Sequence, residues 1–152
     1  MKHLKLAKLT IASLLVSASV YIAPSVQAET KVTTAEDINW GYLNPARGDK
    51  SPGAADLWGD RTKDTATGML VRFNKGSEGS ITSSGDEFKA VVIQGSLSYI
   101  DENKSNARTL NASSYVASST PAKHHLRNIS DDETIVYVRA SSKYQVNDLV
   151  SR

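Results

Sequence analysis

The chain has 152 residues, with 18 Lys and Arg against 16 Asp and Glu, a formal net charge of +2 and no cysteine. This near-balance of charge argues against a nucleic-acid-binding protein, which needs a basic surface. The absence of cysteine excludes disulfides and thiol chemistry. The length is sufficient for one domain with a hydrophobic core of its own.

The start of the chain predicts a secretory signal peptide. Three lysines lie among the first eight residues, residues 9–23 are apolar or small, and residues 26–28 offer a cleavage site. The apolar run has 15 residues, whereas a membrane-spanning helix needs roughly 20. We therefore expect residues 1–28 to be cleaved after Ala28, with no stable membrane insertion afterwards.

Export alters how the charge is interpreted. Removing the leader would leave 15 basic and 16 acidic residues, a net charge of −1, so the basic excess belongs to the leader. We expect an exported protein, located in a periplasm first and outside the cell second, with no nucleic acid among its partners. Because it has no cysteine, its fold must rely on packing, unlike many small secreted domains.

Residues 29–66 predict an N-terminal arm and a loop that pack on the following domain. Residues 38–62 are dense in Gly, Pro, Asn and Asp, and turn residues at this frequency exclude a long helix. Trp40, Leu43 and Trp58 give the loop apolar side chains that can hold it against a core.

Residues 67–152 predict a β-barrel domain. Five segments are short, rich in β-branched or aromatic residues, and bounded by Gly, Pro, Asn or Ser, which is typical of strands. They are residues 68–74, 87–100, 113–119, 122–128 and 133–141. Strands at this spacing predict an all-β sandwich or barrel.

Few residues of the mature chain could carry metal or nucleophilic chemistry. His124 and His125 are adjacent, as are Asp86 and Glu87, and neighbours on a strand point to opposite faces. A catalytic zinc usually takes three protein ligands, and a non-haem iron takes two His and one carboxylate. A zinc or iron site would therefore need carboxylate ligands from elsewhere in the sequence, or ligands from a second chain. A Ser-His-acid triad lacks the G-x-S-x-G elbow.

Three stretches resemble a known family. Residues 39–60, 68–76 and 88–95 resemble a group of small uncharacterised cupins that look related to the cupin domain of zinc-dependent anti-sigma factors. The resemblance implies a single cupin-type double-stranded β-helix, a jelly-roll barrel in which two antiparallel sheets close on a small cavity. Cupins often pair through edge strands, and exposed edges favour pairing, so a homodimer is an option.

The first cupin metal motif has the form G-x5-H-x-H-x3,4-E-x6-G. When its last glycine is aligned with Gly95, Thr82 and Ser84 occupy the histidine positions and Phe88 the glutamate position. Neutral hydroxyls are weak ligands, and the phenylalanine ring has no lone pair to offer a metal. The resemblance therefore implies a metal motif that has lost its first three ligands.

The second motif, P-x-G-x2-H-x3-N, is better preserved. His124 and Asn128 keep its H-x3-N spacing, whereas Ser119 and Pro121 replace the expected Pro and Gly. His124 is thus the one remaining metal-ligand position, and a single imidazole does not hold a divalent ion against water. We expect neither a bound metal nor another cofactor.

These observations favour an exported, metal-free, cupin-like protein that binds a small polar ligand such as a sugar or sugar acid. The expected ligand-binding residues are Thr82, Ser84, Phe88 and His124, and no catalytic residue is assigned. A cupin-type isomerase, lyase or oxygenase using His124 as general acid or base is one alternative. A structural or interaction protein with a filled barrel is another. Four further side chains could reach an anionic ligand: Arg72, Tyr99, Tyr137 and Arg139.

Overall fold

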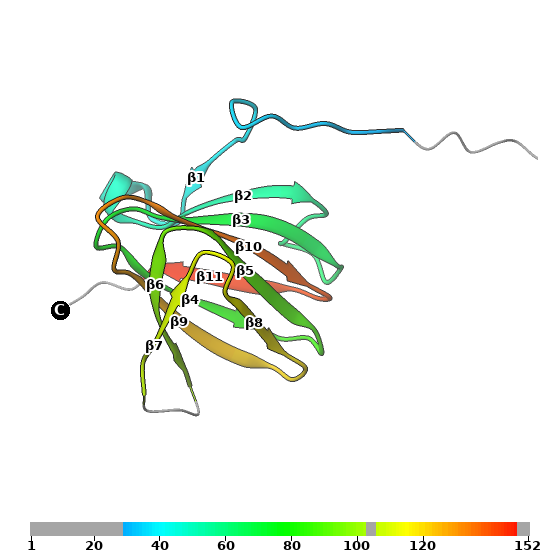
Figure 1. The fold of residues 1–152 in the computed structure, drawn as a ribbon. Helices are drawn as coiled ribbons and strands as arrows, with labels where there is room; N and C mark the ends of the chain where they lie inside the picture. Colours follow the sequence, from blue (N-terminus) through cyan, green and yellow to red (C-terminus); the bar gives the residue numbers. More distant parts are fainter. Residues whose placement is uncertain (1–28, 103–105, 149–152) are drawn as a thin grey trace, which may run out of the picture. The chain divides into compact units, whose positions relative to one another are not determined.

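The computed structural model describes residues 29–102 and 106–148, and its regular structure is nearly all β (Figure 1). The strands are β1 (Gly41–Tyr42), β2 (Gly53–Trp58), β3 (Thr67–Phe73), β4 (Glu78–Ser83), β5 (Phe88–Gln94), β6 (Ser96–Asp101), β7 (Arg108–Asn111), β8 (Tyr115–Ser118), β9 (Ala122–Asn128), β10 (Thr134–Ala140) and β11 (Tyr144–Asp148). A short 3-10 helix, η1, spans Pro45–Lys50. Within the described residues, no helix has the length and apolar character to cross a membrane.

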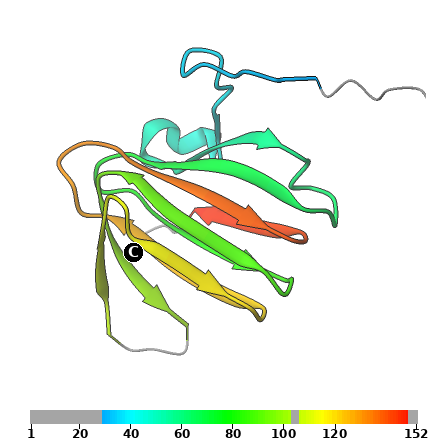
Figure 2. The same cartoon turned by 45° about the vertical axis from the view of Figure 1, so that its right-hand side comes forward.

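The strands form two facing antiparallel sheets. One has six strands in the order β1-β2-β3-β10-β5-β8, and the other has five in the order β11-β4-β9-β6-β7. Consecutive strands such as β4 and β5 lie in different sheets, so the chain crosses repeatedly between the two layers (Figures 1 and 2). This arrangement is the two-layered β-barrel that the sequence predicts.

The core lies between the two sheets and follows the alternation of each strand. Met69, Val71 and Phe73 of β3 are fully buried, and successive residues of a strand point to opposite faces. The other core residues come from every layer of the barrel: Ala54, Ile81, Phe88, Ala90, Val92, Leu97, Tyr99, Leu126, Val136, Val138 and Ala140.

Several strands lie where the sequence predicts none. Residues 53–58 were expected in a loop, but β2 pairs with β3, and Ala54 lies opposite Val71 with both side chains buried. The strands β1, β4, β7 and β11 are likewise additions to the predicted set. Their residues are often small or polar, so their strand structure depends on pairing with neighbours rather than on intrinsic preference.

Asn128, the asparagine of the second motif, holds the turn between β9 and β10. Its side-chain amide donates to the backbone oxygens of Phe73 and Asp132, at 2.8 and 2.7 Å. Its side-chain oxygen accepts from the Ser130 backbone N–H at 2.7 Å and from Thr134 Oγ1 at 3.0 Å. A buried polar side chain satisfied in this way stabilises the turn, so its role in this chain is structural.

Candidate functional site

His124 lies inside the barrel, in the middle of β9. It pairs with Ile81 of β4 on one side and with Asp101 of β6 on the other, so these three side chains share the inner face. Its side chain is only 2% exposed. The sequence expectation that His124 faces inward and His125 outward therefore matches the burial of the two residues.

Phe88, which projects from the opposite sheet, stacks on His124. The two ring centroids lie 4.1 Å apart and the ring planes differ by 15°. An aromatic ring thus covers one face of the imidazole and helps to fill the barrel interior. The inner face of the barrel is closed by a ring stack instead of being open for a ligand.

Tyr99 connects this buried stack to the surface. Its hydroxyl lies 2.9 Å from Nδ1 of His124, a normal hydrogen-bond distance. The other ring nitrogen, Nε2, is buried and has no hydrogen-bond partner among the described residues. Burial lowers the pKa of His124, and the partial opposing effect of Asp101 does not reverse that direction. The imidazole is therefore neutral at neutral pH.

The barrel interior is almost filled. The cavity around His124 has a volume of about 10 Å³, and one water molecule needs roughly 10–15 Å³. Its lining is apolar apart from His124 and Tyr99: Phe88, Ala90, Val92, Leu97, Leu110, Val116, Leu126 and Val136. No sugar-sized molecule fits in this space without movement of the core.

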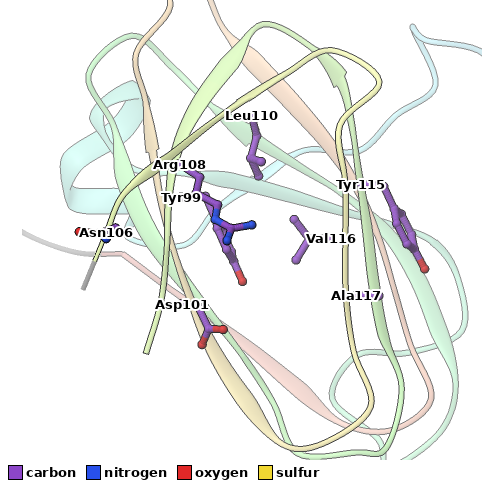
Figure 3. Close-up of a pocket in the computed structure, with 8 residues that line it drawn as sticks. All are labelled: Tyr99, Asp101, Asn106, Arg108, Leu110, Tyr115, Val116 and Ala117. Atoms are coloured by element: carbon purple, nitrogen blue, oxygen red, sulfur yellow. The ribbon is translucent and has the colours of Figure 1, made fainter. Parts of the chain in front are cut away.

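A larger pocket lies directly outside this interior cavity, at one mouth of the barrel. We call it the mouth pocket. Its volume is about 220 Å³, and its lining residues are Tyr99, Asp101, Asn106, Arg108, Leu110, Tyr115, Val116 and Ala117 (Figure 3). Tyr99, Leu110 and Val116 also line the interior cavity, so they separate the two spaces.

The mouth pocket carries opposite charges beside a phenol. Arg108 of β7 lies directly opposite Tyr99 of β6, and Asp101 is two residues further along β6 on the same face. Figure 3 shows the ends of these three side chains turned toward the same space, whereas the ring of Tyr115 is turned away from it. Burial, followed by the Asp101 carboxylate, raises the pKa of Tyr99, and Arg108 opposes this only in part. The phenol therefore stays protonated.

The four residues predicted to bind a ligand do not all lie together. Phe88 and His124 are stacked. Thr82 lies opposite Lys123, on the face of β4 that points away from the buried Ile81. Ser84 is exposed beyond the end of β4 and donates a hydrogen bond to the backbone oxygen of Lys143. Neither hydroxyl residue lines the mouth pocket or the interior cavity.

Of the four side chains that could reach an anionic ligand by their position in the sequence, Tyr99 alone lines the mouth pocket. Arg72 lies over the ring of Trp40, 4.5 Å from its centroid. Tyr137 accepts a hydrogen bond from Trp58 Nε1 at 3.3 Å, and Arg139 pairs with Glu87. Arg108 was missed because β7 was not predicted, and only the pairing of β6 with β7 places it beside Tyr99. Asp101 was missed because it lies on β6 just beyond the predicted strand of residues 87–100.

No three His, Cys, Asp or Glu side chains within residues 29–102 and 106–148 come close enough together to hold a metal ion. Of the four positions that the cupin motifs assign to metal ligands, only His124 presents a nitrogen to the interior. Its Nδ1 is already hydrogen-bonded to Tyr99. The residues present therefore do not fit the metal that cupin motifs usually hold.

The two antiparallel sheets form the double-stranded β-helix fold of the cupins. The polyketide cyclase RemF from Streptomyces resistomycificus is similar with a TM-score of 0.61 and 12% identity over 82% of this chain and 88% of RemF. KdgF from Halomonas sp. is similar with a TM-score of 0.56 and 13% identity, over 74% of this chain and 94% of KdgF. An RmlC-like cupin from Ralstonia eutropha is similar with a TM-score of 0.57 and 14% identity, over 81% of this chain and 78% of that protein. At these identities the likeness establishes the fold alone.

The chain belongs to the family described as a domain of unknown function, DUF4437, whose model matches residues 31–79 and 74–147. No curated protein matches the sequence.

Proposed function

We propose that this chain is an exported, metal-independent cupin that binds a small polar ligand, such as a sugar or sugar acid, in the mouth pocket. The observation that carries the proposal is a pocket of about 220 Å³ with Tyr99, Asp101 and Arg108 turned into it, above an interior of about 10 Å³. Sites for drug-sized ligands are typically 300–1,000 Å³, so this pocket suits a smaller molecule.

The proposal moves the binding site from the barrel interior to its mouth. In the interior, the stack of Phe88 on His124 occupies the volume that a ligand would need. At the mouth, the positively charged Arg108 can donate hydrogen bonds and the negatively charged Asp101 can accept them. The Tyr99 hydroxyl can donate or accept. A molecule with several hydroxyl groups can satisfy all three at once.

Loss of the metal motif is part of the same proposal. Ancestry shared with the cupin domain of zinc-dependent anti-sigma factors accounts for His124 and Asn128 at their motif spacing. Replacement of the other three ligands by Thr82, Ser84 and Phe88 left an interior that packs instead of coordinating. The binding role then depends on residues outside both metal motifs.

A binding screen with a matched pair of variants tests this function. Thermal unfolding is followed with neutral sugars and with sugar acids, using D-glucose and D-glucuronate as first probes. A stabilising shift that is lost in Arg108→Gln and kept in Arg127→Gln supports the proposal, because Arg127 lies exposed on the opposite face of β9 from His124. No shift with any sugar or sugar acid favours the structural protein with a filled barrel.

An enzyme remains the second candidate, because Tyr99 links the mouth pocket to His124 at 2.9 Å. His124 itself does not line that pocket, so Tyr99 would be the group in contact with a substrate. A sugar acid that is chemically altered by the wild-type protein, and not by Tyr99→Phe, would favour this candidate.

Export is tested separately from binding. The protein is recovered from producing cells after fractionation, and its intact mass is measured. A chain that begins at Glu29 in the exported fraction supports the proposed signal peptide. An uncleaved chain retained inside the cell contradicts it.

A further inference from the structure

The strand β8 is a free edge of the six-stranded sheet. It stands last in the order of that sheet and pairs with β5 on one side, and no described strand pairs with its other side. Tyr115 is 56% exposed and Ala117 is exposed as well, so the edge is open to solvent. The outward backbone N–H and C=O groups of such an edge can pair with a strand from another molecule.

The sequence of β8 does nothing to prevent such pairing. Edge strands of soluble proteins are usually protected by charged side chains, by proline or by being very short. The strand β8 reads Tyr-Val-Ala-Ser and contains neither a charge nor a proline. The other three edge strands differ, because β7 contains Arg108, β11 contains Asp148 and β1 has only two residues. Among the described strands, β8 is therefore the edge best suited to accept a partner.

The pairing of β8 with β5 shows which of its backbone groups face outward. The N–H of Val92 on β5 donates to the backbone oxygen of Ser114 at 3.0 Å. In an antiparallel pair, hydrogen-bonded positions alternate with positions whose backbone groups face away. Val116, two residues after Ser114, therefore also bonds toward β5. Tyr115 and Ala117 direct their N–H and C=O groups to the free edge.

We propose that two copies of this chain form a homodimer by antiparallel pairing of β8 with the partner's β8, about a two-fold axis at Val116. In this register Tyr115 faces the partner's Ala117, and Ala117 faces the partner's Tyr115. Every outward N–H and C=O of these two residues then has a partner at once. A shift by two residues would pair only one of them and leave the other outside the ladder. The strand is thus self-complementary, as a two-fold interface requires.

The side chains agree with the same register. On the outer face a large residue meets a small one, because Tyr115 lies beside the partner's Ala117. On the inner face Val116 lies opposite the partner's Val116 in a non-hydrogen-bonded pair, the kind in which side chains approach most closely. Since β8 carries no charged residue, no charge on this strand opposes its own copy across the axis.

The dimer also adds to the mouth pocket. Tyr115, Val116 and Ala117 line that pocket and also form the free edge (Figure 3), so the pocket reaches the line along which the partner binds. The partner's Val116 then joins its lining. The pairing itself needs no ligand, so its test is independent of the proposed binding function, and the failure of either one leaves the other in place.

Light scattering on the purified protein measures the dimer. Because a four-residue strand gives a small interface, which is typical of weak association, we expect the molar mass to rise from one chain to two with increasing concentration. Ala117→Lys adds a charge at the edge, and Ala117→Pro removes an outward N–H without removing a bond to β5. Both variants should keep the mass of one chain and the circular dichroism of the wild type.

Thr109→Lys is the matched control, because Thr109 is exposed on β7, the edge of the other sheet. This variant should dimerise as the wild type does. A wild type that has the mass of one chain up to concentrations on the order of 1 mM overturns the proposal. A dimer that persists in both folded Ala117 variants also overturns it. If Ala117→Pro does not fold, Ala117→Lys decides.

A single cysteine tests the register, because the chain has none of its own. In Val116→Cys the two introduced cysteines would have Cα atoms about 4.5 Å apart, within the roughly 4.4–6.8 Å that a disulfide spans. Leu110→Cys is the matched control, since Leu110 is also half-buried and lines the other side of the mouth pocket. Under mild oxidation we expect nearly complete cross-linking of Val116→Cys and little of Leu110→Cys. Equal yields in the two variants, or no cross-link in Val116→Cys, overturn the proposed pairing.

Discussion

At the scale of single residues, Phe88 determines how the barrel interior is filled. Its ring centroid lies 4.1 Å from that of the buried His124. The ring fills the interior, contacts the imidazole and leaves only about 10 Å³ of space. This one side chain therefore supplies much of the packing around His124.

Truncating this ring is expected to destabilise the protein strongly. Phe88→Ala should lower the free energy of unfolding by about 3–5 kcal/mol, because it removes a fully buried aromatic side chain and leaves a cavity. Urea unfolding measures the change. Ile93→Ala is the matched control, since Ile93 is on the same strand but 53% exposed, and its loss should stay below about 1 kcal/mol. Equal losses in both variants would mean that Phe88 is not packed as described.

The buried imidazole also makes stability depend on pH. Burial lowers the pKa of His124 in the folded state below its unfolded value of about 6.5, so the unfolded chain binds more protons between the two values. Stability therefore falls as pH decreases from about 6.5 through the folded pKa, and it is constant with respect to this group above that window. Asp101 opposes the effect and His125 adds to it.

Unfolding in urea at a series of pH values from about 7.5 to 5 measures this slope. In His124→Gln the slope over the same range should be smaller, whatever the absolute stability of the variant. Comparison of slopes excludes the general loss of packing that the substitution brings. A variant with the same slope as the wild type would assign the pH dependence to other groups.

At the scale of secondary structure elements, the sequence predicted the strands that have clear alternation. Met69, Val71 and Phe73 on β3, and Phe88, Ala90 and Val92 on β5, occupy the inner face as their pattern indicates. The missed strands have weak patterns: β2 reads Gly-Ala-Ala-Asp-Leu-Trp and β4 reads Glu-Gly-Ser-Ile-Thr-Ser. Small residues give little strand preference, so only their neighbours in the sheet make these segments extended.

The same limit applies to the candidate site. His124 was expected to face inward because the motif spacing and the strand alternation agree on it. Arg108 could not be placed, because it meets Tyr99 only through the register of β6 with β7. Asp101 follows Tyr99 by two residues on β6, one residue beyond the end of the predicted strand. Thr82 was expected inside on motif spacing alone, whereas the alternation of β4 around the buried Ile81 turns it outward.

Among the connections between elements, the β9–β10 turn is expected to be sensitive to a single atom. Asn128→Asp keeps the shape of the side chain but replaces the amide that donates to the Phe73 and Asp132 backbone oxygens. Two acceptors would then face a carboxylate in a buried site, and the free energy of unfolding should fall by about 2 kcal/mol or more.

Asn111→Asp is the matched control for this turn. Asn111 is exposed, and its side-chain oxygen only accepts from Ser96 Oγ at 2.9 Å, which a carboxylate does equally well. Chemical unfolding of both variants should show a large loss for Asn128→Asp and little change for Asn111→Asp. A small loss in both would show that the turn does not depend on the Asn128 amide.

At the scale of the whole molecule, stability is expected to depend on packing without help from metal or disulfide. The chain has no cysteine, and the two sheets bury a continuous apolar core that includes Phe88. The motif position at Phe88 thus contributes to the same core as Met69 and Val138. A domain built in this way keeps its fold under conditions that remove metal ions.

Thermal unfolding before and after dialysis against a chelator tests this property. A structural ion present at 100 times its dissociation constant would contribute about 2.7 kcal/mol, and its removal would lower the melting temperature by on the order of 10 °C. We expect no change, because His124 is the one motif position that presents a nitrogen to the interior and its Nδ1 already contacts Tyr99. Elemental analysis of the same sample provides the control. A stoichiometric ion whose removal lowers the melting temperature would mean that donors outside both motifs coordinate a metal.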